Sequence, residues 1–138
     1  MTRTKIQIDK DIEAQSKICN KCEERLSFNS FYNNKNFPDN KDGKCKQCAH
    51  KQQVKRRSIK WKELFKYKGE ECAHCGVSEP AHPEIYDFHH IDPEVKEKQI
   101  ADLILCKKER LYEEADKCLM LCSNCHRKEH AKLRGEVK

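Results

Sequence analysis

Four Cys-x-x-Cys pairs account for eight of the ten cysteines in this chain of 138 residues. The pairs begin at Cys19, Cys45, Cys72 and Cys122. Paired cysteines at this spacing are typical of structural zinc sites, in which four thiolates surround one ion as a tetrahedron. The chain is 38% charged and only 36% hydrophobic, so it has little material for a large apolar core. We therefore expect bound zinc to close the fold.

The expected cellular compartment follows from the absence of targeting segments together with the paired cysteines. The first ten residues contain no apolar segment of the kind that starts a secretory signal. No stretch approaches the roughly 20 apolar residues that a membrane span needs. We therefore predict a cytoplasmic protein that is not secreted, in a reducing environment where paired cysteines bind metal. The alternative, a disulfide-rich secreted domain, fits this context less well.

The N-terminal part of the chain divides into two predicted segments. Residues 1–17 are polar, and we expect a flexible segment there. Residues 18–49 carry two knuckles separated by 22 residues, with Asp42-Gly43 predicting the turn before the second knuckle. This spacing is typical of a four-cysteine zinc ribbon. The predicted ligands of this first zinc are Cys19, Cys22, Cys45 and Cys48.

A strongly basic segment follows, and we predict a linker helix over residues 50–69. It contains eight Lys or Arg against one acid, Glu63, so it carries +7 while the rest of the chain sums to −1. Basic charge concentrated in this way is typical of a surface that binds a polyanion, although a solvated charged face is the alternative. The residues expected to contact a nucleic-acid backbone are Lys51, Lys55, Arg56, Arg57, Lys60 and Lys62.

Residues 70–138 form the last predicted unit. Apolar and β-branched patterning predicts a strand over residues 85–89, helical structure over 94–116 and a strand over 118–121. A final helix is expected from His126 to Leu133, where Gly135 stops it. The order of these elements is β-β-α on a zinc site. Its predicted ligands are Cys72, Cys75, Cys122 and Cys125.

A set of histidines is left over once these cysteines are assigned. His89 and His90 end the first strand, while His126 and His130 lie one helical turn apart on one face. A finger built from Cys122, Cys125, His126 and His130 is the alternative. It fails because Cys125 and His126 are adjacent and cannot easily face one ion, and because Cys72 and Cys75 would lose their partners. The histidines are therefore available for a second metal.

Two motifs carry a resemblance to a known family. They are Phe88-His89-His90-Ile91-Asp92-Pro93 and Leu121-Cys122-Ser123-Asn124-Cys125-His126-Arg127-Lys128-Glu129-His130. Residues 72–134 resemble an HNH nuclease domain, and the whole chain resembles small phage endonucleases of the homing type, which would place it in the host cytoplasm. The fold class that this implies is a small, zinc-stabilised α+β protein. It comprises an N-terminal zinc ribbon, a basic linker helix and a C-terminal ββα-metal domain.

The resemblance also assigns roles to residues. His89, His126 and His130 would bind one catalytic divalent ion (Mg²⁺, Mn²⁺, Ni²⁺ or Zn²⁺) beside the two structural zincs. His90 would be the general base that activates water, and Arg127 would clamp the phosphate. The implied activity is hydrolysis of DNA phosphodiester bonds, leaving 5′-phosphate and 3′-hydroxyl ends.

Two features of the chain bear on those roles. Successive residues of a strand face opposite sides, so His89 and His90 can share one phosphate only if His90 lies beyond the strand end. We expect Ile91-Asp92-Pro93 to make that turn. The family's central Asn is replaced by Lys117, so Asp116 or a backbone contact must take over its bracing role.

Two rival functions remain open. The chain could be a non-catalytic two-zinc regulator that binds DNA or RNA, in which case the histidines are incidental. It could also be a redox protein, although four pairs that form two sets fit zinc better. We expect double-stranded DNA as the partner, neither a membrane nor a small-molecule substrate, and a monomeric protein. Cys106 and Cys118 are expected to be buried small hydrophobic residues.

Overall fold

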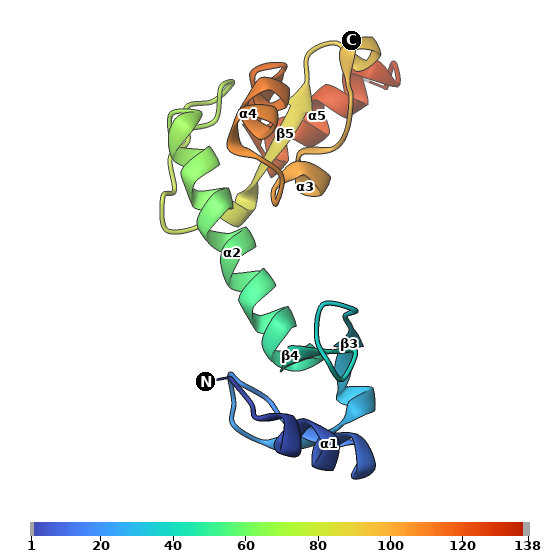
Figure 1. The fold of residues 1–138 in the computed structure, drawn as a ribbon. Helices are drawn as coiled ribbons and strands as arrows, with labels where there is room; N and C mark the ends of the chain where they lie inside the picture. Colours follow the sequence, from blue (N-terminus) through green and yellow to red (C-terminus); the bar gives the residue numbers. More distant parts are fainter. Residues whose placement is uncertain (1, 137–138) are drawn as a thin grey trace. The chain divides into compact units, whose positions relative to one another are not determined.

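The computed structural model describes residues 2–136 of the chain. The chain divides into two compact units, Met1–Lys55 and Arg56–Lys138, with the boundary inside helix α2 (Lys46–Tyr67). Short antiparallel sheets alternate with helices along the chain, as Figure 1 shows. The predicted small α+β fold is confirmed at this level, with two clusters of four cysteines. No helix within residues 2–136 has the length and apolar character needed to span a membrane.

The first unit is built from one helix and two hairpin-like pairs of strands. Its elements before α2 are α1 (Lys5–Glu13), β1 (Ser16–Ile18), β2 (Arg25–Ser27), the 3₁₀ turn η1 (Phe28–Ser30), β3 (Phe31–Asn33) and β4 (Lys41–Cys45). β1 pairs with β2 and β3 with β4, both antiparallel. We expected residues 1–17 to be flexible, but the structure has a helix there, with Thr4 accepting the N-cap hydrogen bond from the Gln7 amide.

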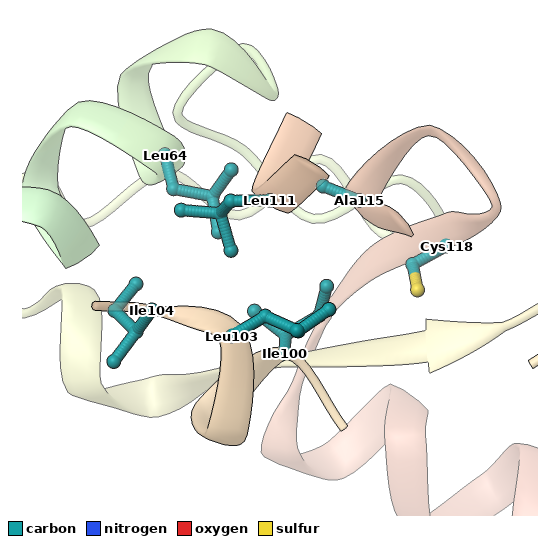
Figure 2. Packing of buried hydrophobic residues seen from close by; sticks show 7 residues of the cluster. All are labelled: Leu64, Ile100, Leu103, Ile104, Leu111, Ala115 and Cys118. Carbon is teal, nitrogen blue, oxygen red and sulfur yellow. The ribbon is translucent and has the colours of Figure 1, made fainter. Parts of the chain in front are cut away.

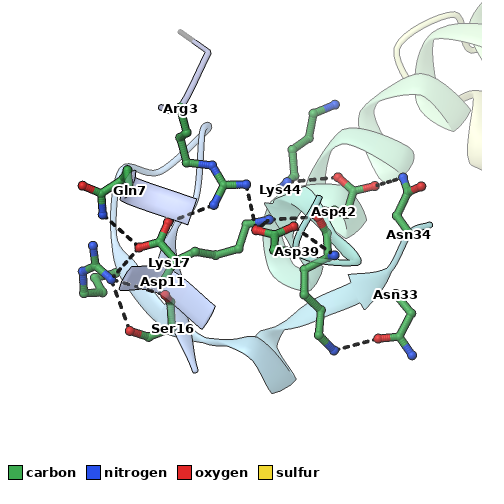
Figure 3. A network of polar contacts seen from close by, with 12 residues as sticks. Arg3, Gln7, Asp11, Ser16, Lys17, Asn33, Asn34, Asp39, Asp42 and Lys44 are labelled. Carbon is green, nitrogen blue, oxygen red and sulfur yellow. Dashed lines mark hydrogen bonds and ion pairs between the residues drawn. The ribbon is translucent and has the colours of Figure 1, made fainter. Parts of the chain in front are cut away.

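Buried ion pairs hold α1 and the first strands together (Figure 3). Asp11 accepts from Arg3 at 2.9 Å and from Arg25 at 3.1 Å. Asp39 accepts from Arg3 at 2.7 Å and lies 2.9 Å from the Lys17 ammonium. Lys17 is only 1% exposed, and it also donates to a backbone carbonyl. A buried charge is tolerated only when it is paired, so these contacts fix the helix against the sheets.

Helix α2 begins four residues before the predicted start and ends two before the predicted end. Within the second unit it buries Leu64 and Phe65, and Trp61 packs edge-on against Phe88 with ring centroids 5.3 Å apart. The helix ends where Gly69 takes a φ of +94°, a conformation that residues with a side chain rarely adopt. These apolar side chains of α2 therefore pack within the second unit.

The second unit places a hairpin between helices. Its further elements are η2 (Pro83–Ile85), β5 (Tyr86–His90), η3 (Pro93–Val95), α3 (Ile100–Leu103), α4 (Lys108–Asp116), β6 (Cys118–Cys122) and α5 (Ser123–Leu133). β5 and β6 are antiparallel, with Tyr86 opposite Cys122 and His90 opposite Cys118. The helical structure predicted over 94–116 is divided into three pieces, because Lys96, Gln99 and Lys107 have extended backbones.

Two apolar clusters pack around this hairpin. The first joins α2, α3, α4 and the start of β6, and Figure 2 shows its residues: Leu64, Ile100, Leu103, Ile104, Leu111, Ala115 and Cys118. The second gathers around the cysteines: Phe65, Cys72, Tyr86, Met120, Leu121, Cys122 and Cys125. Cys118 is 1% exposed and Cys106 is partly buried against the first cluster, as expected of small hydrophobic residues. The unit therefore has a packed core as well as a cysteine cluster.

Candidate metal centres

The first cysteine cluster lies in the first unit. The Sγ atoms of Cys19, Cys22, Cys45 and Cys48 all lie within 4.8 Å of one another. The Lys21 and Cys45 amides donate to the Cys19 sulfur at 3.4 and 3.3 Å. Burial raises the pKa of the Cys19 thiol, but backbone N–H groups oppose this and lower the pKa to about 6. The four predicted ligands are thus gathered with a thiolate favoured among them, which fits a closed zinc site.

The second cluster repeats this arrangement at the end of the hairpin. The Sγ atoms of Cys72, Cys75, Cys122 and Cys125 lie within 4.8 Å of one another. Cys75 and Cys122 have their sulfurs 3.8 Å apart, and four sulfurs at zinc bonding distance in a tetrahedron are spaced by about 3.8 Å. Burial again raises the pKa of the Cys72 thiol, and amide donors lower it to about 6. This set also fits zinc, and neither His126 nor His130 belongs to it.

Three histidines form a separate cluster between β5 and α5. One ring nitrogen from each of His89, His126 and His130 lies within 4.8 Å of the others. The Nε2 atoms of His126 and His130 are 3.0 Å apart, because the two residues lie one turn apart on α5. The ring of His89, on β5, makes T-shaped contacts with the rings of both His126 and His130. Nitrogens bound tetrahedrally to one zinc-sized ion would be about 3.4 Å apart, so the set is compatible with a metal.

The environment of these rings favours metal binding. Asp87 lies two residues before His89 on the same face of β5, and its carboxylate is 3.0 Å from Nδ1 of His126. A carboxylate on Nδ1 leaves Nε2 free to bind an ion and holds the ring in place. Burial lowers the pKa of His89, and the neighbouring His126 and His130 lower it further, so the neutral ligand form is favoured. Asp87 therefore supports His126.

His90 lies elsewhere than expected. It is the last residue of β5, paired with Cys118, so it is not beyond the strand end in the turn. Tyr86, Phe88 and His90 share one face of the strand, and Asp87 and His89 share the other. The His90 ring is 7% exposed, and its Nε2 lies 2.7 Å from a Glu114 carboxylate oxygen. The prediction that His90 lies in the turn beyond the strand end is therefore wrong.

The residues around Lys117 show what braces this region. The Ile91 amide donates to the Lys117 carbonyl at 3.1 Å, which is a backbone contact of the kind expected. The Lys117 ammonium donates to Glu114 at 2.8 Å. Asp116 instead accepts from the Tyr67 hydroxyl at 2.9 Å and takes no part in the bracing.

Sequence reasoning missed Glu114. Leu111, Glu114 and Ala115 lie on one buried face of α4. An acidic residue within such an apolar stripe indicates a buried polar partner, because a lone buried carboxylate is costly. That pattern is visible in the sequence and could have identified this residue.

The basic residues predicted to contact nucleic acid differ in whether their side chains already make hydrogen bonds within the protein. Lys51, Lys55, Arg56, Lys62 and Arg127 are exposed. Arg57 is also exposed but donates to the Ala101 carbonyl at 3.2 Å, and Lys60 donates to the Cys106 carbonyl at 2.6 Å. The last two side chains thus also tie α2 to the segment around α3.

No family model, curated protein or solved structure matches this chain. The geometry of the histidine cluster and its surroundings is therefore the basis of the functional argument.

Proposed function

We propose that this protein is a metal-dependent DNA endonuclease of the HNH family. The simplest test of this proposal is whether the protein nicks DNA. It would hydrolyse phosphodiester bonds to 5′-phosphate and 3′-hydroxyl ends. The observation that carries the proposal is the meeting of His89, His126 and His130 apart from both cysteine clusters. Structural zinc sites use the cysteines, and a protein that only binds nucleic acid has no need of a further set of ligands.

The chemistry of the site supports this choice. His89, His126 and His130 would hold the divalent ion, with Asp87 orienting His126. A divalent ion there would stabilise the negative charge that develops on the departing 3′ oxygen. The exposed guanidinium of Arg127, next to His126 on α5, would bind a non-bridging phosphate oxygen. The resemblance to HNH nucleases makes His90 the proposed general base, because an imidazole can accept a proton from water.

The charge distribution supports nucleic acid as the substrate. Lys51, Lys55, Arg56 and Lys62 are exposed along α2, which has only one acid. Cations placed along a helix bind the phosphate backbone regardless of base sequence. We propose double-stranded DNA as the partner and the N-terminal four-cysteine unit as a zinc ribbon.

The test is a supercoiled-plasmid nicking assay with zinc-loaded protein and added Mg²⁺, Mn²⁺ or Ni²⁺. Wild type should nick, whereas His90→Ala should lose about 10²–10⁴-fold in rate while its DNA affinity is nearly unchanged. The matched control is His82→Ala, because His82 is exposed and contacts only Glu84 through its ring. If wild type binds DNA but does not nick with any ion, the protein is better described as a zinc-stabilised binding module.

A further inference from the structure

We propose that Tyr32 and Lys46 form a binding site for an unpaired nucleotide of single-stranded DNA, with the base on the ring and a flanking phosphate on the ammonium. The site belongs to the first unit, whereas the histidine cluster belongs to the second. The choice of DNA over RNA rests on the proposed endonuclease function. The stacking site itself rests on the first unit alone.

The backbone of β3 turns the Tyr32 ring toward solvent. Phe31 is 2% exposed and packs in the buried cluster of the first unit, so the next residue of the strand faces the opposite side. The paired residues on either side of Tyr32 are Phe31 with Cys45 and Asn33 with Lys41. Three residues of β4 therefore lie opposite Tyr32 alone, and such an irregularity can re-aim a side chain. Tyr32 is 55% exposed, which leaves much of its ring open to a ligand.

Two lysines place positive charge next to this ring. The ammonium of Lys46, at the start of α2, lies over the Tyr32 ring at 5.6 Å from the ring centroid. Lys44 is one of the β4 residues opposite Tyr32, and its ammonium donates to the neutral side-chain oxygen of Gln52 at 2.7 Å. Neither an aromatic ring nor an amide oxygen neutralises a cation, so both lysines can still bind an anion.

The surrounding segment is basic as well. Residues 41–55 contain five lysines and one acid, Asp42, which gives a net charge of +4. The Asp42 carboxylate accepts from the Lys44 amide at 3.0 Å and from the Asn34 side-chain amide at 3.3 Å, as Figure 3 shows. Its oxygens are thus engaged by donors of the protein. The excess of positive charge favours a polyanion as the partner of this surface.

A nucleotide matches both parts of the site. Every base has a π-face that stacks on an aromatic ring, and the adjoining phosphates bind nearby cations. Bases inside a duplex stack on one another, so an unpaired base is the one that can lie on Tyr32. A protein partner would need apolar neighbours around the ring, but the β4 residues opposite it are Asp42, Gly43 and Lys44. Single-stranded nucleic acid therefore fits this surface best.

The test is fluorescence anisotropy of a labelled thymidine oligonucleotide of about 16 nucleotides, titrated with zinc-loaded full-length protein without further divalent ion. We expect Tyr32→Ala to weaken binding about 5–100-fold and Tyr32→Phe to bind within about twofold of wild type, because stacking needs the ring and not the hydroxyl. The control is Ile6→Ala, since Ile6 is an exposed apolar residue of α1 in the same unit. Equal affinity of Tyr32→Ala and wild type would overturn the inference.

The salt dependence of binding separates the cation from the ring. Lys46→Gln should reduce the slope of log affinity against log salt by about 0.7, the value for one phosphate contact on a single strand, and Tyr32→Ala should leave the slope unchanged. Lys10→Gln is the matched control, because Lys10 is an exposed residue of α1. Equal slopes for Lys46→Gln and wild type would remove Lys46 from the site.

Duplex DNA and RNA of the same length test the kind of partner. Tyr32→Ala should change duplex affinity by less than about twofold, because the bases of a duplex are already stacked. An equal loss of affinity for the duplex and the single strand would overturn the assignment to unpaired DNA. Tighter binding of wild type to a uridine oligonucleotide than to the thymidine oligonucleotide would overturn it too.

A further measurement needs no variant. In NMR spectra of zinc-loaded wild type, the oligonucleotide should move the ring-proton signals of Tyr32 upfield, because a stacked base shields them, and leave those of the buried Tyr86 in place. Unmoved Tyr32 signals at saturation would overturn the inference. Binding that depends on Tyr32, in a protein that nicks no plasmid, would overturn the proposed nuclease function and support the stacking site.

Discussion

The two units of the molecule each carry a cluster of four cysteines but differ in what surrounds it. In the first unit the buried apolar cluster consists of Cys19, Phe31 and Cys45, and buried ion pairs add polar contacts to it. In the second unit two clusters of seven buried residues each pack against the β5-β6 pair. The first unit therefore has little apolar core beside its cysteine cluster and ion pairs, whereas the second unit also has extensive apolar packing.

This difference explains where surplus polar groups can reside. In the first unit Asp11, Asp39 and Lys17 are buried and paired with one another or with arginines. None of them is available to a ligand without disrupting the fold. In the second unit packing supports the hairpin, so His89, His126 and His130 need no structural partner. The set of histidines that is left over from the cysteine clusters therefore lies in the second unit.

Removal of zinc should have the largest effect and should separate the units. Cys45→Ser should unfold the first unit, and Cys122→Ser should disrupt the second, because apparent zinc binding is worth about 10–16 kcal/mol per structural site. We expect Cys122→Ser to retain more structure, since α3 and α4 pack through the first cluster of the second unit. Metal analysis with NMR spectra of each variant provides the measurement. A metal-free protein with a native spectrum would contradict both assignments.

Disruption of the buried ion pairs should have the next largest effect, confined to the first unit. Asp39→Ala leaves the Lys17 ammonium buried without its carboxylate partner, which costs about 3–5 kcal/mol in comparable cases. Denaturant unfolding of zinc-loaded protein gives the free energy of unfolding. Asp9→Ala is the control, because Asp9 is an exposed residue of α1. Equal losses for the two variants would mean that the ion pairs contribute little.

The smallest predicted effect concerns the basic segment. Replacing Lys55, Arg56 and Arg57 with Ala should weaken binding to all DNA sequences. The slope of log affinity against log salt should fall by about 0.9 for each phosphate that these side chains no longer neutralise. Arg57 also donates to the Ala101 carbonyl, so the double variant of Lys55 and Arg56 is the matched control for folding. An unchanged salt slope would identify this face as merely solvated, and weaker binding to only one sequence would indicate base recognition.

Local sequence patterns predicted much of the fold. The cysteine pairs, β5, β6 and α5 lie within three residues of their predicted positions, because spacing, periodicity and stop residues act over a few positions. The helix at residues 5–13 was not predicted. It is stabilised by ion pairs of Asp11 with Arg3 and with Arg25, which lie on either side of Asp11 in the sequence. No local pattern specifies such pairs.

The candidate site was predictable in part. His126 and His130 share a helix face, and the sequence places them there, while their meeting with His89 follows from the β-β-α order. The direction of His90 was not predictable, because it depends on where β5 ends and on Glu114, which lies 24 residues away. One residue of difference at a strand end decides which face a side chain occupies.

The most direct test of a catalytic ion at the histidine cluster is the rate of plasmid nicking as a function of Mn²⁺ concentration, for wild type and His126→Ala. Both proteins should first be loaded with zinc at the cysteine sites. We expect a saturable curve for wild type and a shift of at least about 10–100-fold to higher Mn²⁺ for the variant, because His126 would supply one of three ligands. Identical curves, or no nicking by wild type at any concentration, would contradict the account.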